Sequence, residues 1–339
     1  MWKNVKLFLK FQYHKRRHKH APLVALLHLT SRCNLNCRYC YTEHRGEFPD
    51  LTVEKWKWII DELKKRGCEL IFLMGGEPLL YERVEELVDY VKEKGMQCHL
   101  TTNGILIPEH IAALKKVDLL MVSLDGNERG NNLNRGCFEQ VIAGIETAKK
   151  ERIPLRINSV LTRNTVVDVD WLLEFGESIG AFVGFTIPAK GKDSEGVKGI
   201  LLDNEEILKV HQKLLDLQKD GKKITLSEKS LRHVIEYPKS YEEIIYKGEE
   251  LAKGYSECCY GRYIVFFDSE GSVYPCTTLW EQKDIFQPKN VFRDGFDEAA
   301  RNAWNLPCWI CYCAGGVEWN EMSSFRGLKH ALRFTFGNN

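Results

Sequence analysis

Six short apolar segments alternate with amphipathic helical segments over residues 24–188, and this alternation constrains the fold more than any other feature. The apolar segments cover residues 24–30, 69–76, 97–104, 118–126, 154–162 and 181–188. Strand–helix units that follow one another predict parallel strands joined by right-handed crossovers. Because a closed barrel of this type has eight units, we expect an α/β fold with an open, partial (β/α)6 TIM-like barrel.

Composition limits the class of protein and its partners. The chain has 339 residues and 44% hydrophobic residues, enough to fill more than one core. Its 48 basic and 47 acidic side chains leave a formal charge of +1, so we expect no nucleic-acid partner. It contains neither a long apolar run nor a signal-peptide pattern, which favours a cytoplasmic location. Twelve cysteines in a reducing compartment indicate metal or iron–sulfur binding rather than disulfides.

The pattern changes after the sixth apolar segment, at the Gly-rich stretch AKGKDSEGVKG. Helices are predicted near residues 204–219 and 227–246, and IVFFDSEGSVYPC predicts a hairpin with its turn at Asp268 to Gly271. We therefore divide the chain into a basic amphipathic segment (1–21), the barrel (22–203), a helical linker (204–249), a small cysteine-rich β-hairpin/helix domain (250–316) and a tail (317–339). The basic segment is expected to pack on the barrel, or alternatively to make peripheral membrane contact through residues 1–20.

Three cysteines follow the first predicted strand closely. Cys33, Cys37 and Cys40 can hold three irons of a 4Fe-4S cluster and leave the fourth iron open to an external ligand. The alternative is a zinc site in which His44 is the fourth ligand.

This group resembles the signature Cys-x3-Cys-x2-Cys of the radical SAM superfamily, with Tyr39 just before the third cysteine. Two further motifs are similar to those of the family. Gly75-Gly76-Glu77-Pro78 follows the second predicted strand, and Ser123-Leu124-Asp125-Gly126 ends the fourth. The resemblance covers residues 22 to about 200.

The resemblance implies that the open iron binds S-adenosylmethionine (SAM) and that a reductant such as flavodoxin or ferredoxin supplies an electron. SAM is then cleaved to a 5'-deoxyadenosyl radical, which abstracts hydrogen from a substrate carbon. By the same resemblance, Tyr39 packs on the adenine, Glu77 binds the methionine amino group and Arg135 binds the carboxylate. The implied SAM-binding residues are Tyr39, Gly75, Gly76, Glu77, Thr102, Asn103, Ser123, Asp125, Arg135 and Asn158.

A second group of six cysteines lies between residues 258 and 313. It resembles the SPASM/twitch extension of radical SAM enzymes and implies one auxiliary 4Fe-4S cluster, the second of the chain, with a zinc knuckle as the alternative. The expected ligands are Cys258, Cys276, Cys308 and Cys311. Cys259 is the alternative ligand to Cys258 and Cys313 the alternative to Cys311, and both are also candidate hydrogen-atom donors. Cys68, Cys98 and Cys137 are expected to be buried small side chains.

The substrate class stays open between a ribosomal peptide and a small metabolite such as a sugar, alcohol or lipid. Relatives with these features carry out oxidation, epimerisation or crosslinking, and some decarboxylate tetrapyrroles. Thr277 stands where sulfatase-maturing relatives have an aspartate, which argues against formylglycine formation. The N-terminal WKNVKLFLKF and the tail RGLKHALRF motivate a lipid substrate. The alternative to an enzyme is an iron–sulfur electron carrier that has no catalytic activity of its own.

Overall fold

The computed structural model describes residues 2–40, 46, 49–188, 199–241, 243–251, 255–280, 282, 284–322 and 324. The zinc candidate His44, the centre of the Gly-rich stretch at 189–198 and the basic tail from Arg326 lie outside the described residues.

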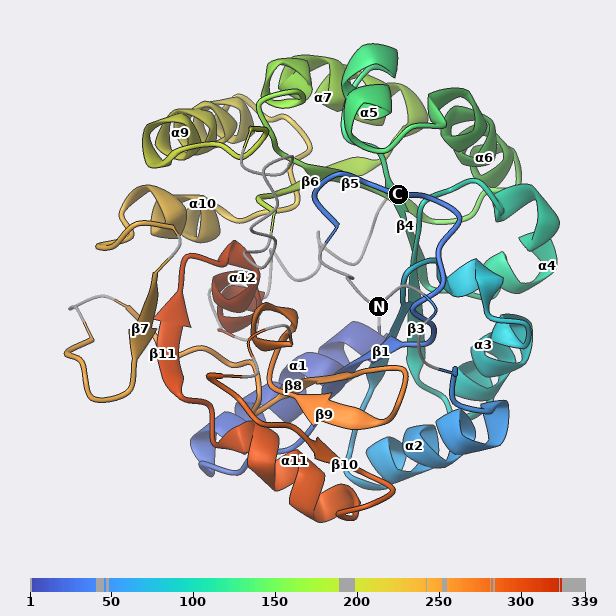
Figure 1. Ribbon diagram of the computed structural model, residues 1–339, viewed down its shortest axis with the longest axis vertical. Coiled ribbons are helices and arrows are strands. Elements are labelled where there is room, and N and C mark those ends of the chain that lie inside the picture. The colour runs from blue at the N-terminus through green and yellow to red at the C-terminus, as the bar shows by residue number, and fades with distance from the viewer. Residues whose placement is uncertain are drawn as a thin grey trace.

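All six predicted strands form, and they run parallel in sequence order. They are β1 (Val24–His28), β2 (Leu70–Met74), β3 (Gln97–Thr102), β4 (Leu119–Ser123), β5 (Leu155–Val160) and β6 (Phe182–Thr186). Figure 1 shows them curving around an interior, with the helices outside. The expected α/β fold with an open (β/α)6 barrel is confirmed, and the carboxyl ends of the strands meet at one edge, where the predicted motifs lie.

The longer outer helices form because each has an apolar stripe and defined ends. At the start of α2, Thr52 accepts a hydrogen bond from Lys55 N at 3.4 Å, and α7 ends at Gly180 with φ 75°. The fully buried side chains of Trp56 and Ile59 on α2 each contribute about 1.5–3 kcal/mol through burial. The outer helices, long and short, are α2 (Val53–Lys65), α3 (Val84–Glu93), α4 (Ile111–Leu114), α5 (Glu128–Asn134), α6 (Phe138–Lys150) and α7 (Val169–Ile179). Short 3-10 turns are η1 (Pro78–Leu80), η2 (Ile107–Glu109), η3 (Val166–Asp168) and η4 (Thr277–Leu279).

The region after the barrel contains one confirmed helix and one that is shorter than expected. A capping box of Asp203 and Glu206 starts α9 (Asn204–Lys219), as predicted. The helix expected over 227–246 is wrong in its second half, because α10 (Glu228–Ile235) ends before Pro238. The residues beyond it form β7 (Ile244–Tyr246), which pairs with β11 (Cys308–Cys311).

The cysteine-rich region extends the same sheet. The predicted hairpin is confirmed as β8 (Ile264–Phe267) and β9 (Ser272–Tyr274), with Gly271 at φ 86° in its turn. The strand β8 pairs in parallel with β1, so the sheet order is β10-β9-β8-β1-β2-β3-β4-β5-β6. The remaining elements are β10 (Lys289–Asn290), α11 (Phe296–Trp304) and α12 (Ala314–Met322). The domain limits stay a prediction.

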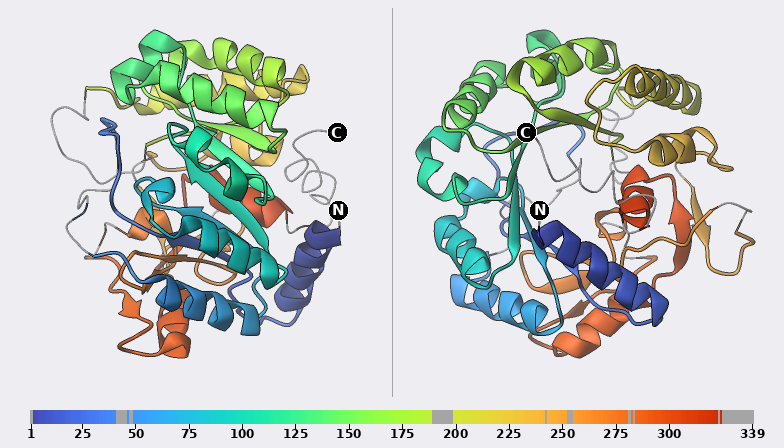
Figure 2. Two further views of the ribbon diagram at one scale, coloured as in Figure 1. Left: turned by 90° about the vertical axis from the view of Figure 1, so that its right-hand side faces the viewer. Right: turned by 180° about the vertical axis from the view of Figure 1, so that it is seen from behind.

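The basic N-terminal segment forms α1 (Trp2–Arg16), which lies across the end of the barrel where the strands begin (Figure 2). Leu7 and Phe11 are buried against β1, β2 and β8, and Lys10 pairs with the buried Glu69. These contacts favour the packing interpretation of this segment. Across the described part of the chain, every helix is too short or too polar to span a membrane.

Candidate active site

The first cysteine group lies in the loop that follows β1, at the carboxyl edge of the sheet. Cys37 and Tyr39 are buried, and they pack with Leu35 and Ile200, with Cys33 and Cys40 at the margin of this cluster. The backbone N–H of Leu35 donates to Sγ of Cys33 at 3.4 Å. Burial raises the pKa of Cys37 to about 11, against the opposing charge of Arg135. The loop therefore holds three thiols together around a small apolar centre.

Gly75 and Gly76 are required because the backbone of this loop passes directly over them. A Cβ on Gly75 would lie 2.6 Å from the carbonyl oxygen of Thr30, and one on Gly76 would lie 2.4 Å from that of Arg32. The N–H of Gly76 donates to Thr30 O at 2.7 Å. The two glycines thus let the cysteine loop approach this backbone closely, and the contact fixes the loop against β2.

Glu77 is fully buried and connects three strand ends. Its carboxylate accepts hydrogen bonds from Thr102 Oγ1 (2.7 Å), Asn103 N (2.7 Å) and Leu79 N (3.1 Å). Asn103 in turn donates from Nδ2 to Oδ1 of Asn34, inside the cysteine loop, at 2.7 Å. Burial raises the pKa of Glu77 to about 7, although these donors oppose the shift. A cation placed nearby would therefore favour the ionised form of this carboxyl group.

Tyr39, Asp125 and Arg135 form a second buried network that reaches a cysteine sulfur. The hydroxyl of Tyr39 donates to Oδ2 of Asp125, and Nε of Arg135 lies 3.0 Å from the same oxygen. Nη1 of Arg135 donates to Sγ of Cys37 at 3.7 Å, and the guanidinium carbon lies 5.5 Å from the centre of the Tyr39 ring. Burial opposes the charged form of Arg135, but the negative charges of Asp125, Tyr39 and Cys37 together outweigh burial and raise the pKa of the guanidinium. Four predicted site residues, Cys37, Tyr39, Asp125 and Arg135, thus meet in one buried network.

Ser123 and Asn158 are neighbours across β4 and β5, in register with one another. Arg156 precedes Asn158 by two residues on the same face of β5, and its Nε donates to Oδ1 of Asn158 at 3.2 Å. The alternate residues Leu155 and Ile157 belong to the core under the outer helices. Arg156 and Asn158 therefore lie on the interior face of the curved sheet.

The second cysteine group forms around the β8–β9 hairpin. Cys258, Cys276, Cys308 and Cys311 all belong to one cluster with Phe266, Tyr274 and Leu279. Cys259 instead packs with Leu7 and Phe11 under α1, and its thiol donates to Gly316 O at 3.6 Å. The four expected ligands are thus brought together without Cys259, although their assignment stays a prediction.

Helix α12 begins at this group with two glycines. A Cβ on Gly316 would lie 2.9 Å from Sγ of Cys258, whereas one on Gly315 would lie 3.6 Å from Sγ of Cys313. A hydrogen bond from Cys311, together with the N–H groups of Gly315 and Gly316, lowers the pKa of Cys313. Cys313 therefore also faces the group.

The two donor sets fit iron–sulfur clusters, because both consist of cysteine thiols, and thiolates are the usual ligands of such clusters. Among the residues with described positions, no group of three His, Cys, Asp or Glu side chains is arranged to hold a single metal ion. The choice between a cluster and a zinc knuckle at the second group stays a prediction. Cys68 and Cys98 are buried as expected, whereas Cys137 is partly exposed, so the expectation of burial is wrong for it.

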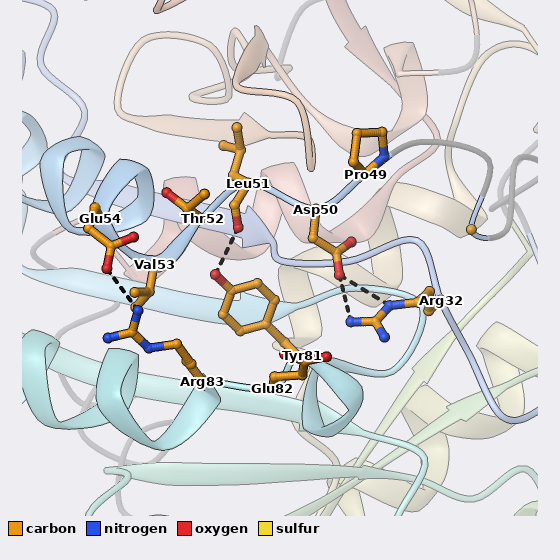
Figure 3. A pocket seen from close by; sticks show the side chains of 11 residues that line it. Arg32, Pro49, Asp50, Leu51, Thr52, Val53, Glu54, Tyr81, Glu82 and Arg83 are labelled. Atoms are coloured by element: carbon orange, nitrogen blue, oxygen red, sulfur yellow. Dashed lines mark hydrogen bonds and ion pairs between the residues drawn. The ribbon is translucent and has the colours of Figure 1, made fainter.

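A surface pocket of about 550 Å³ lies on the outer side of the first cysteine loop. Figure 3 shows its lining, where Arg32 pairs with Asp50, Arg83 pairs with Glu54, and Tyr81 donates to Leu51 O. None of the predicted site residues lines this pocket.

Sequence reasoning missed three features of the site. No sequence motif points to Asn34, because its role is only to accept a hydrogen bond, at Oδ1, from Nδ2 of Asn103. Arg156 carried a signal, since it is the one charged residue of β5 and a cation in a half-buried strand is unusual. Gly315 and Gly316 follow Cys313 after a single alanine, and paired glycines at such a point indicate close approach.

Comparisons with known proteins agree with the family that the motifs resemble and with the fold. The model of the family described as "Radical SAM superfamily" matches residues 27–176. The AdoMet-dependent heme synthase of Methanosarcina barkeri is 31% identical over 328 residues, covering 87% of this chain and 91% of that protein. The Fe-coproporphyrin III synthase of the same organism is 34% identical over 162 residues, covering 45% of this chain and 41% of that protein.

Two solved structures share the fold. Streptococcus suis SuiB bound to the precursor peptide SuiA has a TM-score of 0.67 at 18% identity, covering 95% of this chain and 73% of that chain. The protein anSMEcpe with bound AdoMet and the Kp18Cys peptide has a TM-score of 0.64 at 22% identity, covering 83% and 82%.

Proposed function

The chain belongs to the radical SAM superfamily, and from this premise we propose that it cleaves SAM reductively and abstracts a hydrogen atom from a substrate carbon. The observation that carries the proposal is the meeting of Cys37, Tyr39, Asp125 and Arg135 in one buried network beside the cysteine loop. An electron carrier has no need for such a site beside its cluster. When bound, a 4Fe-4S cluster and SAM supply the electron and the 5'-deoxyadenosyl radical, which no side chain can supply.

The residues of the chain would hold SAM and keep water away. Cys33, Cys37 and Cys40 are the proposed ligands of the cluster. Glu77 is the proposed partner of the SAM ammonium group, because a cation placed against this buried carboxyl would favour its ionised form. We therefore expect SAM binding to release up to one proton per chain near pH 7.

We further propose an iron tetrapyrrole as the substrate. Support comes from the heme synthase relative, which aligns over 91% of its length, and from the second relative, which is also named for an iron tetrapyrrole. Such compounds carry carboxylate side chains, and Arg156 on the interior face of β5 offers a guanidinium that suits a carboxylate. The second cysteine group is the proposed ligand set of one auxiliary 4Fe-4S cluster, which would accept the electron left on an oxidised substrate.

The test is an anaerobic incubation of the reconstituted protein with SAM, dithionite and Fe-coproporphyrin III. We expect 5'-deoxyadenosine together with a tetrapyrrole of altered mass, measured by liquid chromatography and mass spectrometry. 5'-Deoxyadenosine with an unchanged tetrapyrrole would overturn the substrate and leave the SAM chemistry standing. If no SAM is cleaved in any incubation, the enzymatic proposal is wrong and the electron-carrier alternative is favoured.

A peptide is the second candidate substrate. The motive is the fold shared with SuiB, which was crystallised with its precursor peptide SuiA. A candidate peptide from a neighbouring gene, placed in the same incubation, should show a mass change if this alternative holds. A flavodoxin or ferredoxin as electron donor, a cytoplasmic location and membrane contact through residues 1–20 stay predictions.

A further inference from the structure

Arg135 lies between an acidic side chain and a cysteine sulfur. Its Nε is 3.0 Å from Oδ2 of Asp125, and its Nη1 donates to Sγ of Cys37 at 3.7 Å. The side chain is 11% exposed and that of Asp125 is fully buried. Solvent therefore screens the charge of the guanidinium only weakly at the sulfur.

The position of the guanidinium is fixed from several sides. Asp125 is itself held, because its Oδ1 accepts from Val160 N at 2.9 Å and its N–H donates to Oδ1 of Asn131 at 3.2 Å. Tyr39 donates to the same carboxylate that pairs with Arg135, and its ring lies beside the guanidinium. The hydrogen bond to Cys37 is thus set by β4, β5 and the start of α5, which position Asp125.

We propose that Arg135 is a positioning residue that raises the reduction potential of the SAM-binding cluster through its hydrogen bond to Cys37. Hydrogen bonds to the sulfurs and net charge are two of the factors that set cluster potentials. One-electron reduction adds a negative charge to the cluster and its thiolates, and the fixed guanidinium stabilises the reduced form more than the oxidised form. The electron comes from the external reductant.

This inference rests on the proposed function, since it needs a cluster on Cys33, Cys37 and Cys40. It concerns a different property from SAM binding, however, and the two can be measured separately. A hydrogen bond to a charged group has a free energy that corresponds to about a tenfold change in an equilibrium constant or more. For R135Q we therefore expect the equilibrium constant of reduction to fall about tenfold, which is about 59 mV for one electron.

The experiment is a redox titration of the full-length reconstituted protein, followed by electron paramagnetic resonance. All variants carry Cys276→Ala, which removes the signal of the second cluster, and the SAM-responsive signal is identified in the parent by the change in its spectrum when SAM is added. R135Q should lower the midpoint potential of this signal, and R135K, which keeps the charge, should lower it less.

R32Q is the matched control. Arg32 lies next to Cys33, but its guanidinium binds Asp50, Thr30 and the carbonyl of Leu80, and its side chain is 45% exposed. Its loss should leave the potential within experimental error. An equal fall in R32Q and R135Q would overturn the specific role of the contact to Cys37.

The outcomes separate the inference from the function on which it rests. A SAM-responsive signal with the same potential in R135Q as in the parent overturns the inference alone. If R135Q binds no iron, the midpoint potential of R135K is compared with that of the parent instead. An unchanged potential in R135K overturns the inference. A parent protein without any SAM-responsive signal overturns both the proposed function and this inference.

Discussion

Replacing Gly316 with alanine should separate folding of this chain from binding of its auxiliary cluster. The new Cβ would lie 2.9 Å from Sγ of Cys258, and an ordinary contact needs about 3.5 Å, so the sulfur must move by about 0.6 Å. Rotation of a cysteine side chain is cheap for folding. It is costly for ligation, because metal–ligand distances are held within about 0.2 Å. Alanine also favours helix α12 by about 1 kcal/mol relative to glycine.

We therefore expect Gly316→Ala to fold with a midpoint of thermal unfolding close to that of the parent, but to hold about four irons per chain instead of about eight. Gly315→Ala is the matched control. Its Cβ would meet Sγ of Cys313 and Oη of Tyr260 at 3.6 Å, which is ordinary contact. Both variants are assayed by iron content and circular dichroism. Equal iron in the two variants would refute the role of Gly316 and remove Cys258 from the expected ligands.

Three further predictions follow from the same structure. Cys33→Ala should abolish SAM cleavage, whereas Cys276→Ala should cleave SAM without forming product, and equal loss in both would assign the second group a structural role. Glu77 has its pKa raised by burial to about 7 from 4.5, so the folded state binds more protons between these values and stability should fall by about 3 kcal/mol as pH rises through that window. Denaturant titrations of the metal-free protein should show this fall in unfolding free energy with pH, and Glu77→Gln should not show it. The same pH dependence in Glu77→Gln would mean that another group causes it. Phe11→Ala should lower the free energy of unfolding by about 3–5 kcal/mol, because the ring is 2% exposed and packs on Tyr263 and Trp319; a loss of liposome binding without a loss of stability would instead support membrane contact.

The barrel was predictable because its information is local. Each of its strands is a short apolar run with a helix after it, and periodicity alone identifies such units. The failure at residues 227–246 has a non-local cause. The segment Ile244–Tyr246 becomes a strand only because Cys308–Cys311 is available as its partner, some 60 residues later along the chain.

The sequence predicts a set of residues for the site, but it does not predict the contacts between them. The motifs identified Glu77 and Arg135, but spacing does not say that Glu77 connects β3 to the cysteine loop through Asn103 and Asn34. It also does not say that Arg135 reaches Cys37. Such contacts depend on which strand ends meet and on which rotamers the packing permits, and both are properties of the folded chain.

The shared sheet explains how two cysteine groups far apart in sequence come to lie beside one interior. The first group follows β1, the second surrounds the β8–β9 hairpin, and β1 pairs directly with β8 over Val24 to Leu27. At the end of β1, the His28 ring packs 4.6 Å from that of Trp280 and 6.0 Å from that of Phe266, both in the second region. Burial lowers the pKa of His28 to about 3, so the ring is neutral at neutral pH. A hydrogen-bonded strand pair and a packed aromatic contact therefore fix the two cysteine groups relative to one another. An electron transfer between the groups would cross this rigid part of the fold. We expect that loosening the β1–β8 contact impairs product formation more than SAM cleavage.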